Sequence, residues 1–424
     1  MAQGRKLVVN GNNHLREWLA AVPMEGQQRS LWKNGHASLL PTCFHVLCSE
    51  TSDHPISRDE CDSTIDVIKR QQREADGLFS PGPLKRNELS SHSANYLRMQ
   101  ATYFAIHALD ALGERPKHRV SFCDQLQDPS YLRGWLDGGP WQNPWLHSNN
   151  IMFALTFLQT DSEWLGDDAS ARGVDAILDY LDKRQDEETG LWQPDDETDI
   201  ANSVYAAYHF FPYYFWRGRC PNHVNRIIDS TLSIQQPGGL FGGGACEDLD
   251  AVHILVMMSL VSDYRAADIR KALERCFWRL LQLQNPDGGF PNNPATATTN
   301  DFGKGWKRRL AERTGIVKIL PKQLRSRGLP ELLQWYYSGW KPLGCLYGQS
   351  DLWGSWFRPL AIKLIAERYS DLVGEVSIGR YRSLPGLGWH DSERICAAAT
   401  SNASSAEESG CYRNSHVNSR TLST

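Results

Sequence analysis

Apolar residues recur at helical spacing along several long segments of the chain. Segments 169–185 and 267–284 carry them at positions i, i+3, i+4 and i+7, which indicates one buried face of a helix. Segment 92–112 contains neither Gly nor Pro, and segment 350–369 is largely apolar. We expect a helix over each of these four segments. Few runs alternate apolar and polar residues, so strands should be scarce.

A turn motif separates the expected helices and repeats along the chain. A helix end that contains Gln is followed by Gly and an aromatic residue. The clearest copies are QQREADGLF (71–79), RQDEETGLW (184–192), QQPGGLF (235–241) and QNPDGGF (284–290), and the weaker ones are QQRSLW (27–32) and LDGGPW (136–141). The closing aromatics are Trp32, Phe79, Trp141, Trp192, Phe241 and Phe290, separated by 47, 62, 51, 49 and 49 residues. A period of about 50 residues fits two helices and two loops per unit.

The repeats predict an all-α fold in which helix pairs form a ring of two concentric layers. Each turn joins an outer helix to an inner one, so the starts of the inner helices should frame the mouth of a central cavity. We assign residues 1–375 to this single domain, and the helix over 350–369 closes the ring. Residues 291–330 interrupt the period with a Thr- and Asn-rich loop and a basic run, GKGWKRRLAER, that reads as a solvated helix face. Residues 376–424 become rich in Ser, Asn and Ala and are expected to form an irregular to disordered tail.

Composition and charge narrow the classes of partner. Hydrophobic residues make up 41% of the chain and the net charge is −4, so no basic excess is available to hold a nucleic acid backbone. The ten Cys residues form no C-x-x-C pair, which is typical of free thiols in a reducing cytoplasm. The N-terminal residues lack the apolar stretch of a signal peptide, and no apolar run is long enough to span a membrane. We therefore expect a cytoplasmic protein with a small-molecule substrate.

The repeated turns, best developed in QQPGGLFGGG and QNPDGGF, resemble those of the terpenoid cyclase and prenyltransferase superfamily. The resemblance covers roughly residues 20–370. It implies an (α/α)6 toroid and a terpene cyclase-like activity, that of an isomerase or lyase acting on an apolar isoprenoid. Triterpene cyclases pair two helical domains and prenyltransferases add a helical subunit, so the resemblance also implies a partner subunit or a homodimer. Because one fold hosts many activities, the site has to be argued separately.

The segment GGLFGGGACEDLDAVHIL (238–255) carries the candidate catalytic residues Glu247, Asp248, Asp250 and His253. Carboxylates at the start of a helix can simply cap it and match its dipole. Carboxylates crowded at an apolar cavity instead have raised pKa values, and one of them can stay protonated as an acid. Class II terpene cyclases place such an acid in a D-x-D-D motif. The resemblance implies that Asp250 is the proton donor and Asp248 its acidic neighbour, although Ala251 replaces the last Asp of the motif.

Metal sites are weighed at two places, and no cofactor is expected. Zinc-binding prenyltransferases use an Asp and a Cys two residues apart with a distant His. Cys246 and Asp248 have that separation in reverse order, and His253 is much nearer. The run DDETD (195–199) matches the Mg²⁺-diphosphate motif D-D-x-x-D of class I terpene synthases, but it lacks the second motif, so acidic capping of the next helix is the preferred interpretation.

Polar and aromatic residues at the starts of the inner helices are candidates for substrate binding. They are His92, Tyr96, His147, Asn149, Tyr205, His209, Trp353 and Trp356. As a set converging on one mouth they could line the cavity, where aromatic faces stabilise a carbocation by about 0.5–2 kcal/mol each. Packing in the core is the alternative role for any one of them.

Three functional hypotheses follow from these residues. The first is a terpenoid cyclase or prenyltransferase-like enzyme that cyclises an isoprenoid with Asp250 as the acid. The second is a carbohydrate-active lyase or hydrolase on the same ring, with Glu247, Asp248 or a His as acid and base. The third is a non-catalytic toroid that serves as a binding module. A closed aromatic cavity would favour the first, an open polar groove the second and a filled ring centre the third.

Overall fold

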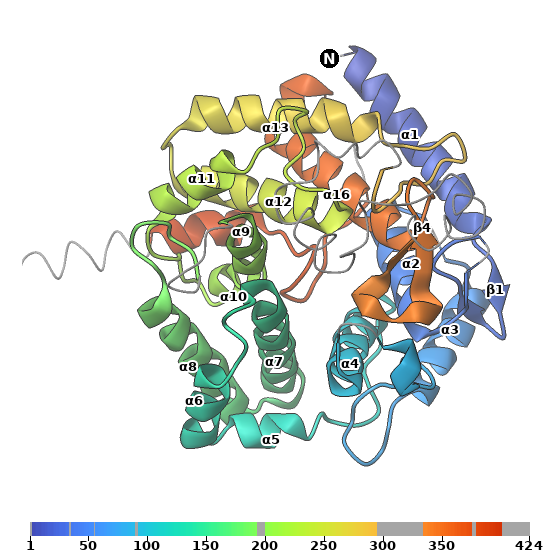
Figure 1. Ribbon diagram of the computed structural model, residues 1–424, viewed down its shortest axis with the longest axis vertical. Coiled ribbons are helices and arrows are strands. Elements are labelled where there is room, and N and C mark those ends of the chain that lie inside the picture. The colour runs from blue at the N-terminus through green and yellow to red at the C-terminus, as the bar shows by residue number, and fades with distance from the viewer. Residues whose placement is uncertain are drawn as a thin grey trace, which may run out of the picture.

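The computed structural model describes residues 2–33, 35–54, 56–89, 92–192, 200–294, 334–374 and 379–400. It shows an all-α toroid, as the repeats predict (Figure 1). The inner helices are α2 (Leu39–Thr51), α4 (Ala94–Ala111), α7 (Pro144–Leu165), α9 (Ile200–Tyr208), α12 (Ala245–Val261) and α16 (Leu352–Arg368). Each inner helix contacts the next, and α16 contacts α2, so the inner layer closes on itself.

The outer layer surrounds this ring with helices that bury only one face. They are α1 (Ala2–Ala20), α3 (Arg58–Arg70), α5 (Phe122–Leu126), α6 (Pro129–Asp137), α8 (Asp168–Arg184), α11 (Val224–Ser233) and α13 (Ala266–Leu281). The short helix α10 (Phe211–Trp216) follows α9 after a break at the residues before Pro212. The expected helices over 92–112, 169–185, 267–284 and 350–369 are confirmed as α4, α8, α13 and α16.

Glutamine side chains lock the four clear turns to the outer layer. Gln72, Gln185, Gln235 and Gln284 each donate one hydrogen bond to the carbonyl of the Gly in their own turn, at 2.7–2.9 Å. Each donates another, at 2.6–2.9 Å, to a carbonyl of a neighbouring outer segment. In the last copy that carbonyl belongs to Gly11 of α1, so the same bond that repeats around the ring also closes it.

The turn glycines are required by both conformation and space. Gly288 has φ 94°, and a Cβ at this position would lie 2.2 Å from the carbonyl oxygen of His14. Gly77 has φ 71°, and a Cβ there would lie 2.0 Å from the carbonyl oxygen of Arg119. Only Gly combines a positive φ with so close an approach of two backbones. The repeated Gly is therefore the contact point between successive outer segments.

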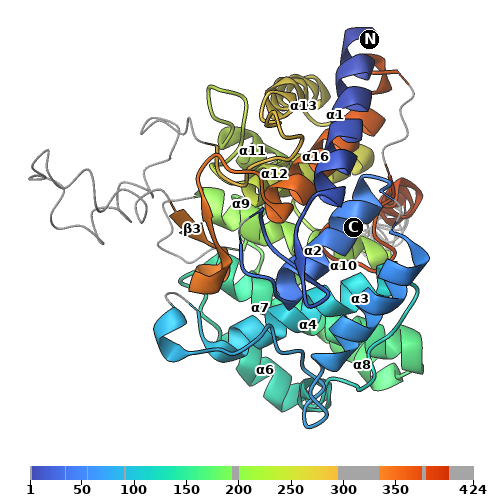
Figure 2. The same ribbon diagram turned by 90° about the vertical axis from the view of Figure 1, so that its right-hand side faces the viewer.

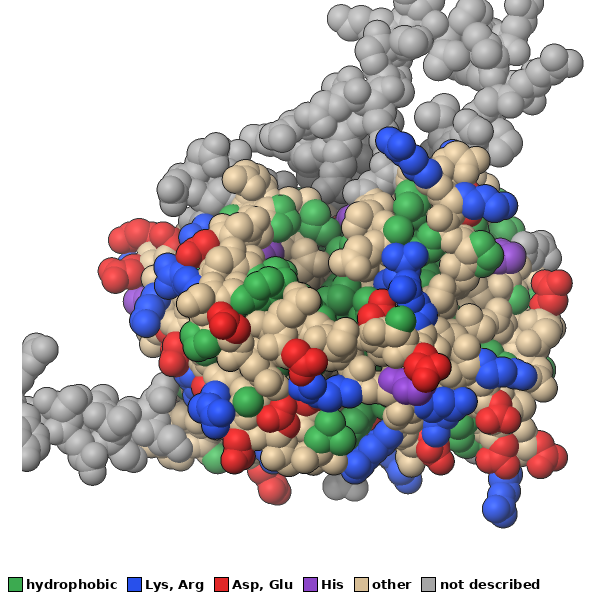
Figure 3. All heavy atoms as spheres, turned by 90° about the horizontal axis from the view of Figure 1, so that it is seen from below, with side chains coloured by type: hydrophobic (Ala, Val, Ile, Leu, Met, Phe, Trp, Pro, Cys, Tyr) green, Lys and Arg blue, Asp and Glu red, His purple; other side chains and the backbone are tan. Residues whose placement is uncertain are grey.

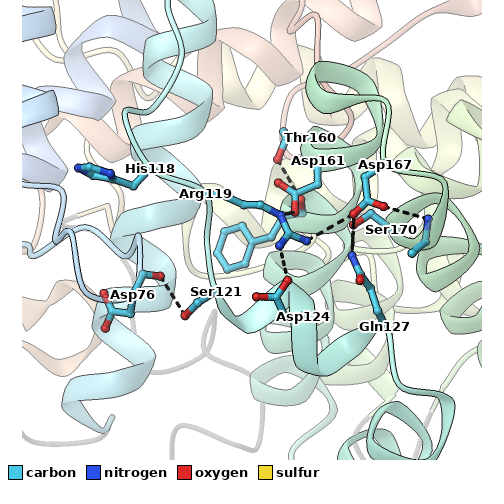
Figure 4. Close-up of polar contacts among 12 residues, drawn as sticks. Asp76, His118, Arg119, Ser121, Asp124, Gln127, Thr160, Asp161, Asp167 and Ser170 are labelled. Carbon is cyan, nitrogen blue, oxygen red and sulfur yellow. Dashed lines mark hydrogen bonds and ion pairs between the residues drawn. The ribbon is translucent and has the colours of Figure 1, made fainter.

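An ionic cluster around Arg119 joins α5 to α7 and α8 (Figure 4). The Arg119 guanidinium lies between the carboxylates of Asp124, Asp161 and Asp167 and forms an ion pair with each. Asp167 also caps α8, where its carboxylate accepts a hydrogen bond from the Ala169 amide at 3.0 Å. The cluster links outer and inner elements on the outside of the ring, away from its centre.

Strands are scarce in the described residues, as predicted. β1 (Met24–Glu25) pairs with β2 (Gln28–Arg29), and β3 (Gln334–Tyr336) pairs with β4 (Gly344–Leu346). The remaining elements are the 3-10 turns η1 (Arg86–Glu88), η3 (Tyr337–Gly339), η4 (Lys341–Leu343) and η5 (Ser370–Leu372). The residues of DDETD (195–199) and of the basic run 303–313 lie outside the described residues.

Part of the segment expected to be a tail packs against the toroid. Residues 379–400 are described: Leu384, Leu387 and Trp389 are buried, and residues 392–400 form a helix. The Arg382 guanidinium donates to the carbonyl of His107 on α4, which anchors this segment to the inner layer. The composition of this segment does not predict its order, because a few apolar residues spread through a polar and Gly-rich stretch are enough to pack the segment against the toroid. Figure 2 shows β3 at one end of the ring and the red C-terminal helix at the other.

The surface carries charges of both signs. Figure 3 shows acidic and basic side chains interspersed over the face seen from below. The nine described cysteines are all free thiols. None of the described helices is both long and apolar enough to cross a membrane.

Candidate active site

A cavity of about 630 Å³ lies at the end of the ring where the inner helices begin. The starts of α4, α7, α9, α12 and α16 frame it, as the alternation of helices and turns predicts. Its aromatic wall consists of Tyr96, Phe104, Trp145, Trp335, Tyr336, Tyr337, Trp353 and Phe357. Its polar groups include His92, Gln100, Asn143, Asn149, Asn202, His209, Asn292 and Ser338. The ring centre is therefore neither filled nor uniformly polar.

Asp250 contributes a carboxyl group to this cavity from the first turns of α12. Its side chain is 1% exposed, and its Oδ2 atom has no hydrogen-bond partner among the described residues. Burial, together with the charges of Glu247 and Asp248, raises the pKa of Asp250 well above its ordinary value. The raised pKa favours the protonated form of this carboxyl group, as a proton donor requires.

Asp248 has a different role, because its two oxygens are already bound. Oδ1 accepts hydrogen bonds from the amides of Phe241 at 2.8 Å and Gly242 at 3.2 Å, and so holds the Gly-rich turn. Oδ2 accepts from the Arg358 guanidinium at 2.8 Å, in an ion pair whose two side chains are fully buried. Burial raises the pKa of Asp248, while Arg358 and the two amides oppose that rise. Asp248 therefore positions the turn and α12 and is absent from the cavity lining.

Glu247 caps the same helix. Its Oε2 atom accepts hydrogen bonds from the amides of Gly243 and Gly244, the latter at 3.1 Å. This is the capping arrangement that the sequence offers as the alternative to catalysis. The carboxylate does not line the cavity, and its charge acts on the chemistry only by helping to raise the pKa of Asp250.

His253 lies outside the cavity, so the structure gives no support to the catalytic role expected for it there. Its Nδ1 atom is 2.9 Å from the Tyr208 hydroxyl, and its Nε2 atom is 3.1 Å from Nδ1 of His390. The side chain is fully buried, and burial lowers its pKa well below the ordinary value. One helical turn beyond Asp250, it belongs to the deeper part of the ring.

Five of the eight expected binding residues line the cavity: His92, Tyr96, Asn149, His209 and Trp353. Three do not. His147 contacts the Leu136 carbonyl at 3.3 Å, Tyr205 donates to the Phe241 carbonyl at 2.9 Å, and Trp356 stacks on Phe357 with ring centroids 4.5 Å apart. Inner helices are apolar on nearly all sides, so the sequence does not show which polar residue faces the centre.

His209 is a neutral base at the cavity wall. Burial lowers its pKa to about 3. The Ser148 hydroxyl donates to the Trp145 carbonyl at 2.9 Å and lies 2.8 Å from His209 Nδ1. The Ser148 hydroxyl proton is already in a hydrogen bond to the Trp145 carbonyl. The Ser148 oxygen therefore accepts a hydrogen bond from His209, whose Nδ1 atom carries the imidazole proton. The lone pair then resides on Nε2.

The segment around β3 and η3 completes the cavity wall and was missed by sequence reasoning. Tyr337 packs edge-on against Phe44 and Trp353, with ring centroids 5.0 Å and 4.7 Å away. The Ser338 hydroxyl donates to Gln100 Oε1 at 2.7 Å and ties the segment to α4. The aromatic run QWYYSGW (334–340) was the available signal, but it falls between two repeats.

The weighed zinc site does not fit the geometry. Asp248 is bound to Arg358 and the Gly-rich turn, and His253 is bound to Tyr208 and His390, so neither turns toward Cys246. No group of three or more His, Cys, Asp or Glu side chains in the described part of the chain is arranged to hold a metal ion.

The comparison with protein families agrees with this architecture. The chain matches the model of the prenyltransferase alpha-alpha toroid domain over residues 72–213 and 217–302. It is similar to the type II terpene cyclase MstE from Scytonema in its apo form, with 13% identity over 87% of this chain and 99% of that chain and a TM-score of 0.46. A polysaccharide lyase is similar with 11% identity over 87% of this chain and 99% of that chain and a TM-score of 0.45. None of the curated proteins matches the chain.

Proposed function

Because the chain belongs to the prenyltransferase alpha-alpha toroid domain family, we propose that its central cavity binds an isoprenoid and that Asp250 starts cyclisation by protonating it. The observation that carries the proposal is the buried Asp250 carboxyl group at an aromatic wall, whose Oδ2 atom has no hydrogen-bond partner among the described residues. Protonation of an alkene or an epoxide requires an acid that is still protonated when the substrate arrives. Burial beside two other carboxylates keeps Asp250 in that form.

The cavity wall suits the cation that such a protonation creates. Trp353 and Phe357 come from α16, and Tyr337 packs against Trp353. Aromatic faces attract a cation by about 0.5–2 kcal/mol each when water is excluded. His209 offers a neutral nitrogen that can take up the proton lost when the last cation collapses to an alkene.

The substrate we favour is neutral. Among the described residues that line the cavity, none is Lys or Arg, and Asp250 is the one carboxylic acid. A diphosphate group is held by cations or by a metal ion with its own ligands. An uncharged polyene or its epoxide needs neither. We place this activity in the cytoplasm, where free cysteines are stable.

Incubation of the purified protein with squalene, its epoxide, and farnesyl and geranylgeranyl diphosphates tests the proposal, with product analysis by mass spectrometry. We expect a cyclic product from a neutral substrate. Asp250→Asn should lower the rate by at least about a hundredfold, because the amide cannot donate an equivalent proton. Asp161→Asn is the matched control, since Asp161 is also buried but pairs with Arg119 outside the cavity. Lack of product from every isoprenoid, or full activity of Asp250→Asn, would refute the proposal.

Amide groups at the cavity mouth favour a carbohydrate substrate as the second candidate. Asn143, Asn149, Asn202, Asn292 and Gln100 resemble a set of hydrogen-bond partners for hydroxyl groups. A glycosidase needs two carboxyl groups, whereas the described lining offers one, so a lyase that uses His209 as its base is the better form of this candidate. Release of unsaturated sugars from a polysaccharide, with no isoprenoid product, would identify it. A protein that binds either ligand without converting it would be a binding module.

A further inference from the structure

A buried acid that gives its proton to a substrate must be protonated again before the next turnover. This requirement rests on the proposed function of Asp250. The cavity is lined by aromatic rings and closed at depth by Leu387, so a bound product separates Asp250 from bulk water on that side. A route from elsewhere in the molecule would let the acid recover while the cavity is occupied.

A chain of hydrogen bonds runs away from the cavity on the deep side of Asp250. The Tyr208 hydroxyl on α9 lies 2.9 Å from His253 Nδ1 on α12, and His253 Nε2 lies 3.1 Å from His390 Nδ1. The Gly388 amide donates to the same Tyr208 hydroxyl at 3.1 Å and fixes it in place. Tyr208 and His253 are fully buried, so this part of the chain runs through the interior of the ring.

The inner end of the chain lies near Asp250, without a direct hydrogen bond to it among the described contacts. Asp250 and His253 are three residues apart on α12, so they share one face of the helix. Tyr208 is near enough to Asp250 for the carboxylate charge to contribute to the raised pKa of its phenol. No direct hydrogen bond joins the two described side chains, so one water molecule would complete the connection, as it does in many proton transfers.

The outer end of the chain reaches a second cavity, of about 780 Å³, at the opposite end of the ring. His390 lines this second cavity together with Tyr381, Trp389 and Glu367. Residues 387–390 thus form a partition, since Leu387 faces the first cavity and Trp389 and His390 face the second. The chain of hydrogen bonds passes through this partition.

We propose that His390, His253 and Tyr208 form a proton relay that recharges Asp250 from the second cavity. A solvent proton binds Nε2 of His390, and the proton on Nδ1 of His390 passes to Nε2 of His253. The proton on Nδ1 of His253 passes to the Tyr208 oxygen, and the Tyr208 hydroxyl proton passes through water to the Asp250 carboxylate. One proton enters, one carboxylate is neutralised, and each relay residue ends neutral. Reorientation of the tautomers then resets the chain.

The relay residues suit transfer and not storage of a proton. Burial lowers the pKa of His390 to about 4, although Glu367 and Asp391 oppose this shift. Burial also lowers the pKa of His253 well below its ordinary value. Both imidazoles are therefore neutral near pH 7. A neutral imidazole accepts at one nitrogen while it donates at the other, which a protonated one cannot do.

The test follows the Asp250 proton directly, with the first cavity filled by squalane, a saturated hydrocarbon that the acid cannot protonate. Infrared difference spectroscopy between wild-type protein and Asp250→Asn identifies the carboxylic acid band of Asp250. Its shift after rapid transfer into D₂O then gives the exchange rate. We expect Tyr208→Phe and His390→Ala to slow this exchange by at least about tenfold. The matched control is Tyr103→Phe. The Tyr103 hydroxyl likewise accepts a hydrogen bond from a backbone amide, that of Leu387 at 2.8 Å, but among the described contacts it has no hydrogen bond to an imidazole.

Chemical rescue of the His390→Ala variant distinguishes a relay role of His390 from a structural one. Imidazole added to His390→Ala should restore fast exchange, since the second cavity has room for it. Unchanged exchange in both relay variants, or slowing that imidazole does not reverse, would overturn the relay while leaving Asp250 as an acid. Absence of any Asp250 acid band near pH 7 would instead refute the proposed function and the relay with it.

Discussion

Asp248 and Asp250 stand two positions apart on α12 but have different hydrogen-bond partners. Both side chains are fully buried. Asp248 forms hydrogen bonds with a guanidinium and two amides, which stabilise its charge. Asp250 has an oxygen without a partner among the described residues, and nearby negative charge disfavours its ionised form. The fold therefore uses the carboxylate of Asp248, whereas the proposed function uses the carboxyl group of Asp250.

Asp250→Asn is expected to raise protein stability at neutral pH, at the cost of activity. Asp250 has a higher pKa in the folded than in the unfolded protein. The folded state thus binds the extra proton, and stability falls as pH rises from about 4 toward the folded pKa, by about 1.4 kcal/mol per unit. Asn escapes this loss, so the difference in melting temperature between variant and wild type should grow with pH above about 4.

Asp248→Asn supplies the matched comparison with the opposite sign. Removal of its charge leaves the buried Arg358 without its ion-pair partner, which costs on the order of 3–5 kcal/mol. Thermal unfolding of both variants between pH 4 and about 8 checks these signs. A lower melting temperature for Asp250→Asn at neutral pH would contradict the assignment of Asp250 as a strained, protonated acid.

At the scale of elements, the repeated turn connects successive outer segments to one another. The Gln amide joins its own turn to a neighbouring segment, and the Gly lets the two backbones approach. The aromatic residue that follows is buried in every clear copy, as Phe79, Trp192, Phe241 and Phe290 show. In the weaker copy at 27–32, Gln27 lies in the β1–β2 turn and makes no such contact within its own turn; it accepts from Arg70 on α3.

Gly288→Ala is expected to destabilise the toroid by several kcal/mol. The new Cβ would lie 2.2 Å from the His14 carbonyl oxygen, at a residue with φ 94°, so α13 would have to move away from α1. Gly166→Ala is the control, because Gly166 also has a positive φ, 66°, but has no atom within 4 Å of the added Cβ. Gly166→Ala should lower the free energy of unfolding by about 1 kcal/mol. Equal losses in denaturant unfolding would show that conformation alone, and not the close approach, explains the motif.

At the scale of the whole molecule, the ring is closed twice. Inner helix α16 packs against α2, and the last Gln turn binds α1 through the Gly11 carbonyl. The C-terminal residues 379–400 then cross the far end of the ring, where the amides of Leu387 and Gly388 donate to hydroxyls of Tyr103 on α4 and Tyr208 on α9. The part of the cavity lining that Leu387 forms thus depends on residues 379–400.

Truncation after residue 378 is expected to destabilise the protein and to open the cavity floor. It removes the buried side chains of Leu384, Leu387 and Trp389, each worth about 2–5 kcal/mol in a packed core. A chain that ends at residue 400 keeps every contact described here and serves as the control. Melting temperature and binding of an apolar dye report the two effects. An unchanged melting temperature after the shorter truncation would show that this segment adds nothing to the core.

Sequence reasoning found the helices and repeats because local spacing encodes them. It expected Asp250 and five other cavity-lining residues at the site because they stand at or near the starts of inner helices. It could not place Arg358 opposite Asp248, 110 residues away, or His390 opposite His253, 137 residues away. It also expected His147, Tyr205 and Trp356 at the cavity, since an inner helix that is buried on all sides gives no amphipathic pattern to orient its polar residues.

The sequence by itself determined the toroid, because each turn needs its own Gln, Gly and aromatic residue and their period sets the number of helix pairs. It also determined that an acidic segment would stand at the start of an inner helix. Only the tertiary structure decided which carboxylate is paired and which is left as an acid. The reason is physical: charge stabilisation and burial depend on partners that the chain brings together from distant positions, and local spacing carries no record of them.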